Sequence, residues 1–253
     1  MPTLSAVAFR VRLGRLLAHR RADPATVARA AGLPAPEVEA VLAGDSVSAA
    51  LLRRLAPALG LHAADLFVIA DRDVPVDLAP ASGTHLWHVG QVMRSAMGLY
   101  GERFDRMHEF IRSLPVLPPV EPLSASTRST EAFVRRLLAN RNIRPHIAHL
   151  LCAVGDGPYV SDSTICRVLN GDTPLTPRYV TAFAAVLGLR PGDLAALTGV
   201  GPPAESTRLY PRRHRLAALA WDARRLNSEQ LSQVQQLAAF LARVGTDAKK
   251  EWP

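Results

Sequence analysis

The chain has little cysteine, few aromatic residues and no long apolar run. Its two cysteines, Cys152 and Cys166, are too few for a disulfide framework. The longest apolar runs are far shorter than the ~20 residues that a membrane-spanning helix needs. Arg10, Arg12 and Arg15 interrupt the first apolar stretch, which is therefore unlike a secretion signal. Because 48% of the residues are hydrophobic, we expect a folded, cytoplasmic protein.

Lysine is also scarce, with two lysines among the 30 basic residues, both near the C-terminus. The net charge of +8 is unevenly distributed along the chain. It is +3 in residues 1–70, −2 in residues 71–127, +3 in residues 128–200 and +4 in residues 201–253. This distribution favours a polyanionic partner, although an ordinary solvated basic surface would explain it equally.

One pattern occurs twice in the chain. Residues 15–20 (RLLAHR) recur as residues 136–141 (RLLANR). Residues 59–66, in which Leu-Gly-Leu precedes Asp-Leu, recur as residues 187–194. Repetition over this length indicates two related domains rather than one large core.

Helical spacing and helix caps recur throughout, and no stretch alternates at period two, so we predict an all-α fold without a sheet. The first repeat spans residues 5–70 and the second repeat spans residues 128–200. A long connecting helix is expected over residues 84–114, followed by a proline-rich linker at 115–130. Two C-terminal helices are expected over residues 211–245.

The expected connecting helix carries an apolar stripe whose steps alternate between four and three residues, as in a heptad repeat. The stripe either packs on one of the repeats or joins two copies of the chain, and the C-terminal helices are a second region suited to a homodimer. The stripe consists of Met93, Met97, Tyr100, Phe104, Met107, Ile111 and Leu114.

The first repeat contains the spacing of two helices that cross steeply. Ala28 lies four residues before Gly32, and Val38 lies six residues after it. A small residue lets the helices approach, glycine suits the tight turn, and an aliphatic residue faces back into the core. The second repeat matches with Ile165 in place of Val38, but about seven extra residues near 154–159 are expected to lengthen its turn.

Here the sequence resembles the helix-turn-helix of the Cro/phage-repressor (XRE) family, in both repeats. The resemblance implies two tandem five-helix domains, double-stranded DNA as partner, a nucleoid-associated location and a role as transcriptional regulator. In such folds the second helix of the motif enters the major groove.

The second repeat presents side chains that can read base edges. Arg167 can donate two bonds to guanine, and Asn170 can pair with adenine. The hydroxyl groups reach bases or phosphates, while Asp162 either accepts from a cytosine amino group or caps the helix. The predicted reading residues are Ser161, Asp162, Ser163, Thr164, Arg167 and Asn170, with Cys166 among them on the same face.

Arginines near this helix are expected to bind phosphates. A basic cluster before the C-terminal helices is a second region for such contacts, or simply a solvated turn. The predicted phosphate-binding residues are Arg135, Arg141, Arg144, Arg178, Arg212 and Arg213.

The first repeat lacks donors at the matching positions, so we predict that it does not read bases. We expect it to contact a protein or to orient the second repeat; alternatively it holds the DNA backbone through Arg10, Arg12, Arg20 and Arg53. The matching positions are Pro34, Ala35, Pro36, Glu37, Glu39, Ala40 and Ala43.

No catalytic or cofactor-binding arrangement is recognisable, so we expect neither an enzyme nor a cofactor. His146, His149 and Cys152 are spaced like metal ligands on a helix but lack a fourth ligand, and His85 and His88 repeat the step, so no metal site is predicted. Two alternatives to a regulator stay open: a low-specificity architectural DNA-binding protein of the nucleoid type, and a protein-interaction scaffold.

Overall fold

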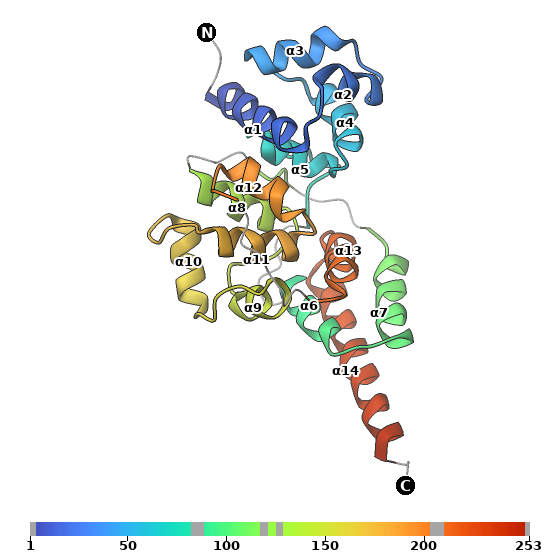
Figure 1. Cartoon of the computed structure of the whole chain (residues 1–253). Coiled ribbons are helices and arrows are strands. Elements are labelled where there is room, and N and C mark those ends of the chain that lie inside the picture. Colours follow the sequence, from blue (N-terminus) through green and yellow to red (C-terminus); the bar gives the residue numbers. More distant parts are fainter. Residues whose placement is uncertain (1–3, 82–88, 117–120, 125–128, 203–209, 251–253) are drawn as a thin grey trace.

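The computed structural model describes residues 4–81, 89–116, 121–124, 129–202 and 210–250. In these ranges every regular element is a helix, and the only bridge between extended segments joins Val74 and Leu123 (Figure 1). The predicted all-α class is therefore confirmed.

Five helices form the first repeat. Asp23 caps the second of them, accepting a hydrogen bond of 3.0 Å from the backbone of Thr26, and Ser48 caps the fourth by accepting 3.1 Å from Leu51. A short polar side chain at this position satisfies an otherwise unpaired helix N–H group. The helices are α1 (Leu4–Arg20), α2 (Pro24–Ala30), α3 (Ala35–Ala43), α4 (Ala49–Ala58) and α5 (Ala63–Ile69).

Five helices also form the second repeat, and they follow the same order. Ser129 caps the first and Ser161 caps the third, each by accepting from a backbone N–H three residues ahead. The third helix packs on the first, whereas the second packs on the fourth. The helices are α8 (Thr130–Ala139), α9 (Ala148–Gly155), α10 (Asp162–Asn170), α11 (Pro177–Leu187) and α12 (Pro191–Thr198).

The prediction of a single connecting helix over residues 84–114 is wrong. Two helices, α6 (Val89–Met97) and α7 (Glu102–Ser113), take its place, while residues 84–88 lie outside the described ranges. The helical conformation is interrupted at Gly101, whose φ of 54° and ψ of −133° are outside the helical region. Glycine adopts such a conformation readily and is a poor helix former, so the break falls there.

The apolar stripe of α6 and α7 is covered by the C-terminal helices α13 (Arg213–Ala223) and α14 (Ser228–Lys250). Met93, Phe104 and Met107 are at most 1% exposed in this four-helix unit. The stripe therefore packs mainly on the C-terminal helices, with a smaller contact between α6 and α9 of the second repeat, and its buried part is not at the surface where a second chain could reach it. The distal end of α14 projects from the rest of the molecule (Figure 1).

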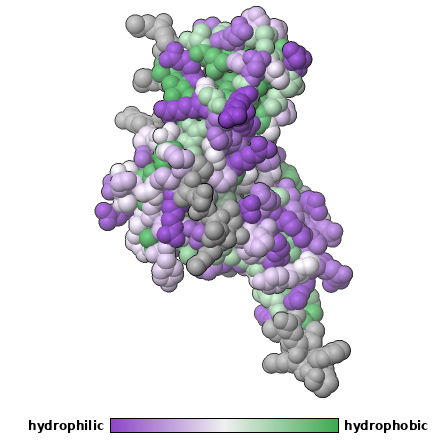
Figure 2. All heavy atoms as spheres, viewed as in Figure 1, coloured by the Kyte–Doolittle hydropathy of each residue, from purple (hydrophilic) through white to green (hydrophobic). Residues whose placement is uncertain are grey.

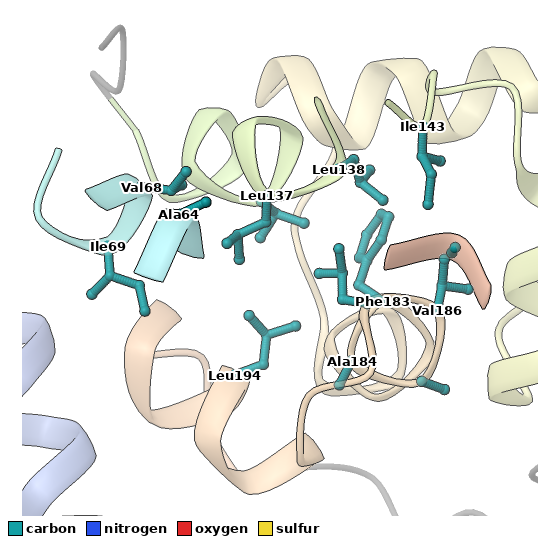
Figure 3. Close-up of a cluster of buried hydrophobic side chains, with 14 of the residues drawn as sticks. Ala64, Val68, Ile69, Leu137, Leu138, Ile143, Phe183, Ala184, Val186 and Leu194 are labelled. Carbon is teal, nitrogen blue, oxygen red and sulfur yellow. The ribbon is translucent and has the colours of Figure 1, made fainter. Parts of the chain in front are cut away.

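The two repeats share one continuous apolar core. Helix α5 packs on α8, and α12 packs on α1. Figure 3 shows Val68 and Ile69 of the first repeat beside Leu137 and Leu194 of the second, and all four are at most 1% exposed. The two repeats therefore pack together and are not independent domains joined by a linker.

Candidate nucleic-acid interface

The first turn of α10 is held by hydroxyl groups. The Ser161 hydroxyl accepts from the backbone N–H of Thr164 at 3.3 Å and lies 2.7 Å from the hydroxyl of Ser163. Ser161 and Ser163 are exposed, and Thr164 is half-buried. The helix thus starts with a cluster of groups that can both donate and accept hydrogen bonds.

Helix α10 has one buried and one exposed face. Ile165, Val168 and Leu169 are at most 1% exposed and anchor the helix in the core. Arg167 and Asn170 are exposed, because steps of two and one from these anchors turn the side chain to the opposite side. Cys166 is half-buried between the two faces.

Asp162 has a structural role. Its carboxylate accepts a hydrogen bond of 2.8 Å from the backbone N–H of Ala148, the first residue of α9. Asp162 was expected either to accept from a cytosine amino group or to cap α10. It does cap a helix, but that helix is α9 rather than α10. This bond fixes the start of α9 against the start of α10.

Asn170 is joined to α8. The Arg135 guanidinium donates to the side-chain oxygen of Asn170, and both residues are exposed. They line a cavity of about 490 Å³ between α8 and α10, together with Ile143, Arg144 and Cys166. While the bond to Arg135 persists, Asn170 offers mainly its amide donors to a ligand.

Three of the predicted phosphate-binding arginines lie on the surface of the second repeat. Arg135, Arg144 and Arg178 are exposed. Arg178 also donates to the backbone oxygen of Asp156 at 3.2 Å, which steadies the turn before α10. The exposure of these three arginines is compatible with the predicted role.

The prediction that Arg141 contacts phosphate is wrong. Its side chain is 2% exposed and donates two hydrogen bonds of 2.8 Å to Asp65, which is fully buried. Burial alone would raise the pKa of Asp65, but the Arg141 guanidinium and the amide of Asn140 more than offset it, so the pKa lies below its ordinary value. An arginine enclosed in this way cannot reach a duplex.

The side chain of Arg212 is also held by other residues of the chain. Its guanidinium donates to the backbone oxygens of Leu99 at 2.6 Å and of Met97 at 3.3 Å, and it lies 4.3 Å from the ring centre of Tyr100. The predicted phosphate contact of Arg212 is therefore wrong, because Arg212 closes the turn between α6 and α7. Arg213 is half-buried at the start of α13, which lies apart from α10 in Figure 1.

The insertion in the second repeat only partly lengthens the turn. Helix α9 continues to Gly155, and the turn to α10 spans residues 156–161, compared with residues 31–34 in the first repeat. Helix α9 crosses α11 so closely that a Cβ at Gly155 would lie 2.4 Å from the Cα of Ala182. Part of the extra length therefore builds a helix crossing instead of a loop.

The corresponding face of α3 is exposed and poor in donors. Pro34, Pro36, Glu37, Glu39 and Ala43 all lie on the surface. Figure 2 shows apolar residues gathered over α1 and α3 of the first repeat. Proline has no N–H group, and glutamate repels phosphate, so this face is unsuited to a groove.

Two of the four arginines expected to let the first repeat hold a DNA backbone face the second repeat instead. Arg12 donates to the backbone oxygen of Ile69 at 3.0 Å and lies 4.4 Å from the ring centre of Phe133. Arg20 forms an ion pair with Asp193. Sequence reasoning missed this polar joint between the repeats, although the repetition of Arg20 as Arg141 was visible.

Three further findings bear on the kind of site. In the residues that the structure describes, no three His, Cys, Asp or Glu side chains are placed to share a metal ion; His85 and His88 lie outside them. Within the same residues, no helix has the length and hydropathy needed to span a membrane. Comparison with known proteins gives no match to a family model, a curated protein or a solved structure.

Proposed function

We propose that the chain is a sequence-specific DNA-binding transcriptional regulator that reads the major groove with α10. The observation that carries the proposal is the division of this helix into an anchored apolar face and an exposed face with Ser161, Ser163, Arg167 and Asn170. A rigid helix with donors along its outer side is the element that fits the width of a major groove.

Arg167 is the strongest base-reading residue of this surface. It is exposed, and no hydrogen bond or ion pair ties its side chain within the described part of the chain. A guanidinium can donate two parallel bonds to O6 and N7 of guanine, an arrangement that no other base pair offers. Ser161 and Ser163, at the start of the helix, suit either a base edge or a phosphate.

The basic surroundings supply attraction that is independent of sequence. Arg135 and Arg144 line a cavity with Asn170 of α10, Arg178 contacts the turn before α10, and all three are exposed. Each guanidinium that neutralises a phosphate releases counterions, which strengthens binding at low salt. In this proposal these arginines position the helix, and α10 provides the specificity.

The homodimer expected from the sequence stays a prediction. Of the two regions named for it, the apolar stripe of α6 and α7 is largely buried inside the chain. The C-terminal region still exposes Phe240 to 60% and Val244 to 51% on the projecting end of α14.

Selection of bound sequences from a random duplex pool, followed by affinity measurements, tests the proposal. We expect the affinity for selected duplexes to exceed that for random duplexes by more than ~10³. Arg167→Ala should cost about 1–3 kcal/mol at one base pair and relax the preference there. Arg94→Ala, an exposed arginine on α6, is the matched control and should change neither.

The other outcomes identify the alternatives. Equal affinity for all duplexes with a steep salt dependence would indicate a low-specificity architectural protein. Absence of binding at low salt would contradict any DNA-binding role and favour the interaction scaffold.

A further inference from the structure

Equivalent residues of the two repeats make equivalent contacts across the joint. Arg20 donates to both oxygens of Asp193, at 2.8 and 2.6 Å. Arg141, its counterpart in the second repeat, donates to both oxygens of Asp65, at 2.8 Å each. Asp65 and Asp193 are themselves counterparts, since each precedes the leucine of the repeated Asp-Leu pair.

The same two arginines also bind equivalent backbone groups within their own repeats. Arg20 donates to the oxygen of Leu59 at 2.6 Å, and Arg141 donates to the oxygen of Leu187 at 2.9 Å. Leu59 and Leu187 are the same position of the repeated Leu-Gly-Leu. Each guanidinium thus joins the end of one repeat's fourth helix to the fifth helix of the other repeat.

A second arginine of the repeated segment follows the same rule. Arg136 donates to the backbone oxygen of Arg72 and lies 3.6 Å from the carboxylate of Asp71. Its counterpart Arg15 lies against Gly199, where a Cβ would be 2.3 Å from the guanidinium. Asp71 and Gly199 are counterparts that both follow a fifth helix, and both have positive φ, at 52° and 71°.

Helix packing shows the same reciprocity. The fifth helix of the first repeat, α5, packs on the first helix of the second, α8, and α12 packs on α1 in return. In an interface between two identical chains, such reciprocity defines a twofold axis. Here the arrangement is intramolecular: the two repeats pair with each other as two subunits of a symmetric dimer would.

The C-terminal helices reinforce one arm of this pairing. Arg224 of α13 donates to the backbone and side-chain oxygens of Asn140, at 2.6 Å each. Trp221 of α13 lies 5.4 Å from the Arg141 guanidinium. The Arg141–Asp65 pair is accordingly 2% and 0% exposed, whereas Arg20 and Asp193 are 20% and 3% exposed.

We propose that the first repeat takes the place that a second chain holds in a symmetric dimer. A single chain is then the complete DNA-binding unit. Its DNA site contains one half-site that α10 reads and no mirrored second half-site. The inference rests on the proposed function of α10. Twofold pairing through α8 and α12 would require surfaces that α5 and α1 already cover. The helix equivalent to α10 is α3, whose exposed prolines and glutamates cannot read a second half-site.

The test combines selection from a random duplex pool with native mass spectrometry of the full chain on the selected duplex. We expect one unmirrored motif and one chain per duplex. Adding an inverted second copy of the motif should raise the affinity per chain by no more than about twofold, the statistical gain from two independent sites. Glu37→Gln with Glu39→Gln should leave the selected motif unchanged.

Two results would overturn the inference. A motif with two mirrored halves at fixed spacing, bound by two chains, would show that a second copy completes the unit, while the proposed reading by α10 would still hold. A pool without any enriched motif would contradict the proposed function and the asymmetric site together. The two failures are therefore distinguishable.

Discussion

Arg141 and Asp65 form an ion pair that is shielded from solvent and joins the two repeats across 76 residues of sequence. The guanidinium is held by two bonds of 2.8 Å to the carboxylate and by the backbone oxygens of Leu187 and Leu137. Nearly every donor of the guanidinium thus has an acceptor. A buried charge is tolerated in a protein only when it is satisfied in this way.

Loss of Arg141 should therefore be far more damaging than loss of its counterpart. Arg141→Met leaves Asp65 charged and unpaired in the core, which should lower the free energy of unfolding by about 3–5 kcal/mol. Arg20→Met should cost about 1–3 kcal/mol, because water reaches the more exposed pair with Asp193. Urea unfolding followed by circular dichroism measures both. Equal losses would contradict the stated difference in burial.

His62 should make the joint sensitive to mild acid. Its ring stacks on Trp221, with ring centres 3.5 Å apart and planes inclined by 8°. Burial lowers the pKa of His62, and although Asp65 acts in the opposite direction, Arg141 and Arg224 add to the lowering. The folded state therefore prefers the neutral ring, so this contribution to stability is present above the unfolded pKa of about 6.5 and decreases as the pH falls below it.

We accordingly expect the free energy of unfolding to decrease between pH 7.5 and 5.5, and His62→Asn to flatten this decrease. Urea titrations monitored by tryptophan fluorescence provide the measurement. His149→Asn, a change at an exposed histidine of α9, is the control and should keep the slope of the unmodified protein. If both variants gave the same slope, His62 would not be the responsible group.

Helix ends were largely predictable from sequence because they depend on local chemistry. Asp23, Ser48 and Ser129 are short polar side chains directly before a helical stretch, and each accepts a hydrogen bond from a backbone N–H group of the helix that follows. The break of the connecting helix also had a local signal, since Gly98 and Gly101 lie three residues apart in its middle. The heptad stripe outweighed that signal because an apolar period records which face is buried, not whether the helix continues.

The joint between the repeats was not predictable from local chemistry. Arginine is usually exposed, so Arg141 was expected at the surface. Its burial depends on Asp65, whose place beside it is fixed only when α5 packs on α8. Arg212 was misjudged for the same reason, since its acceptors are backbone oxygens of a turn that sequence had predicted to be helical.

The crossing of α9 and α11 should be intolerant of added volume. A Cβ at Gly155 would lie 2.4 Å from the Cα of Ala182 and 2.7 Å from its backbone oxygen. Gly155→Ala should therefore lower the free energy of unfolding by about 1–3 kcal/mol. Gly14→Ala is the matched control: it lies within α1 with nothing within 4 Å of the added carbon, and should stabilise the protein by about 0.5–1 kcal/mol. Stabilisation at both positions would contradict the close crossing.

The salt dependence of DNA affinity should distinguish positioning arginines from arginines that merely add charge. If Arg144 and Arg178 each neutralise a phosphate, Arg144→Gln and Arg178→Gln should each reduce the slope of log affinity against log salt by about 0.9. The preferred sequence should stay the same, because phosphate contacts carry no base information. Arg106→Gln, an exposed change on α7, removes the same charge away from α10 and should leave the slope unaltered.

Fluorescence anisotropy at several salt concentrations measures the slopes, and circular dichroism checks that Arg178→Gln, which loses its bond to Asp156, is still folded. Equal reductions for all three variants would mean that net charge, rather than the surface around α10, governs binding.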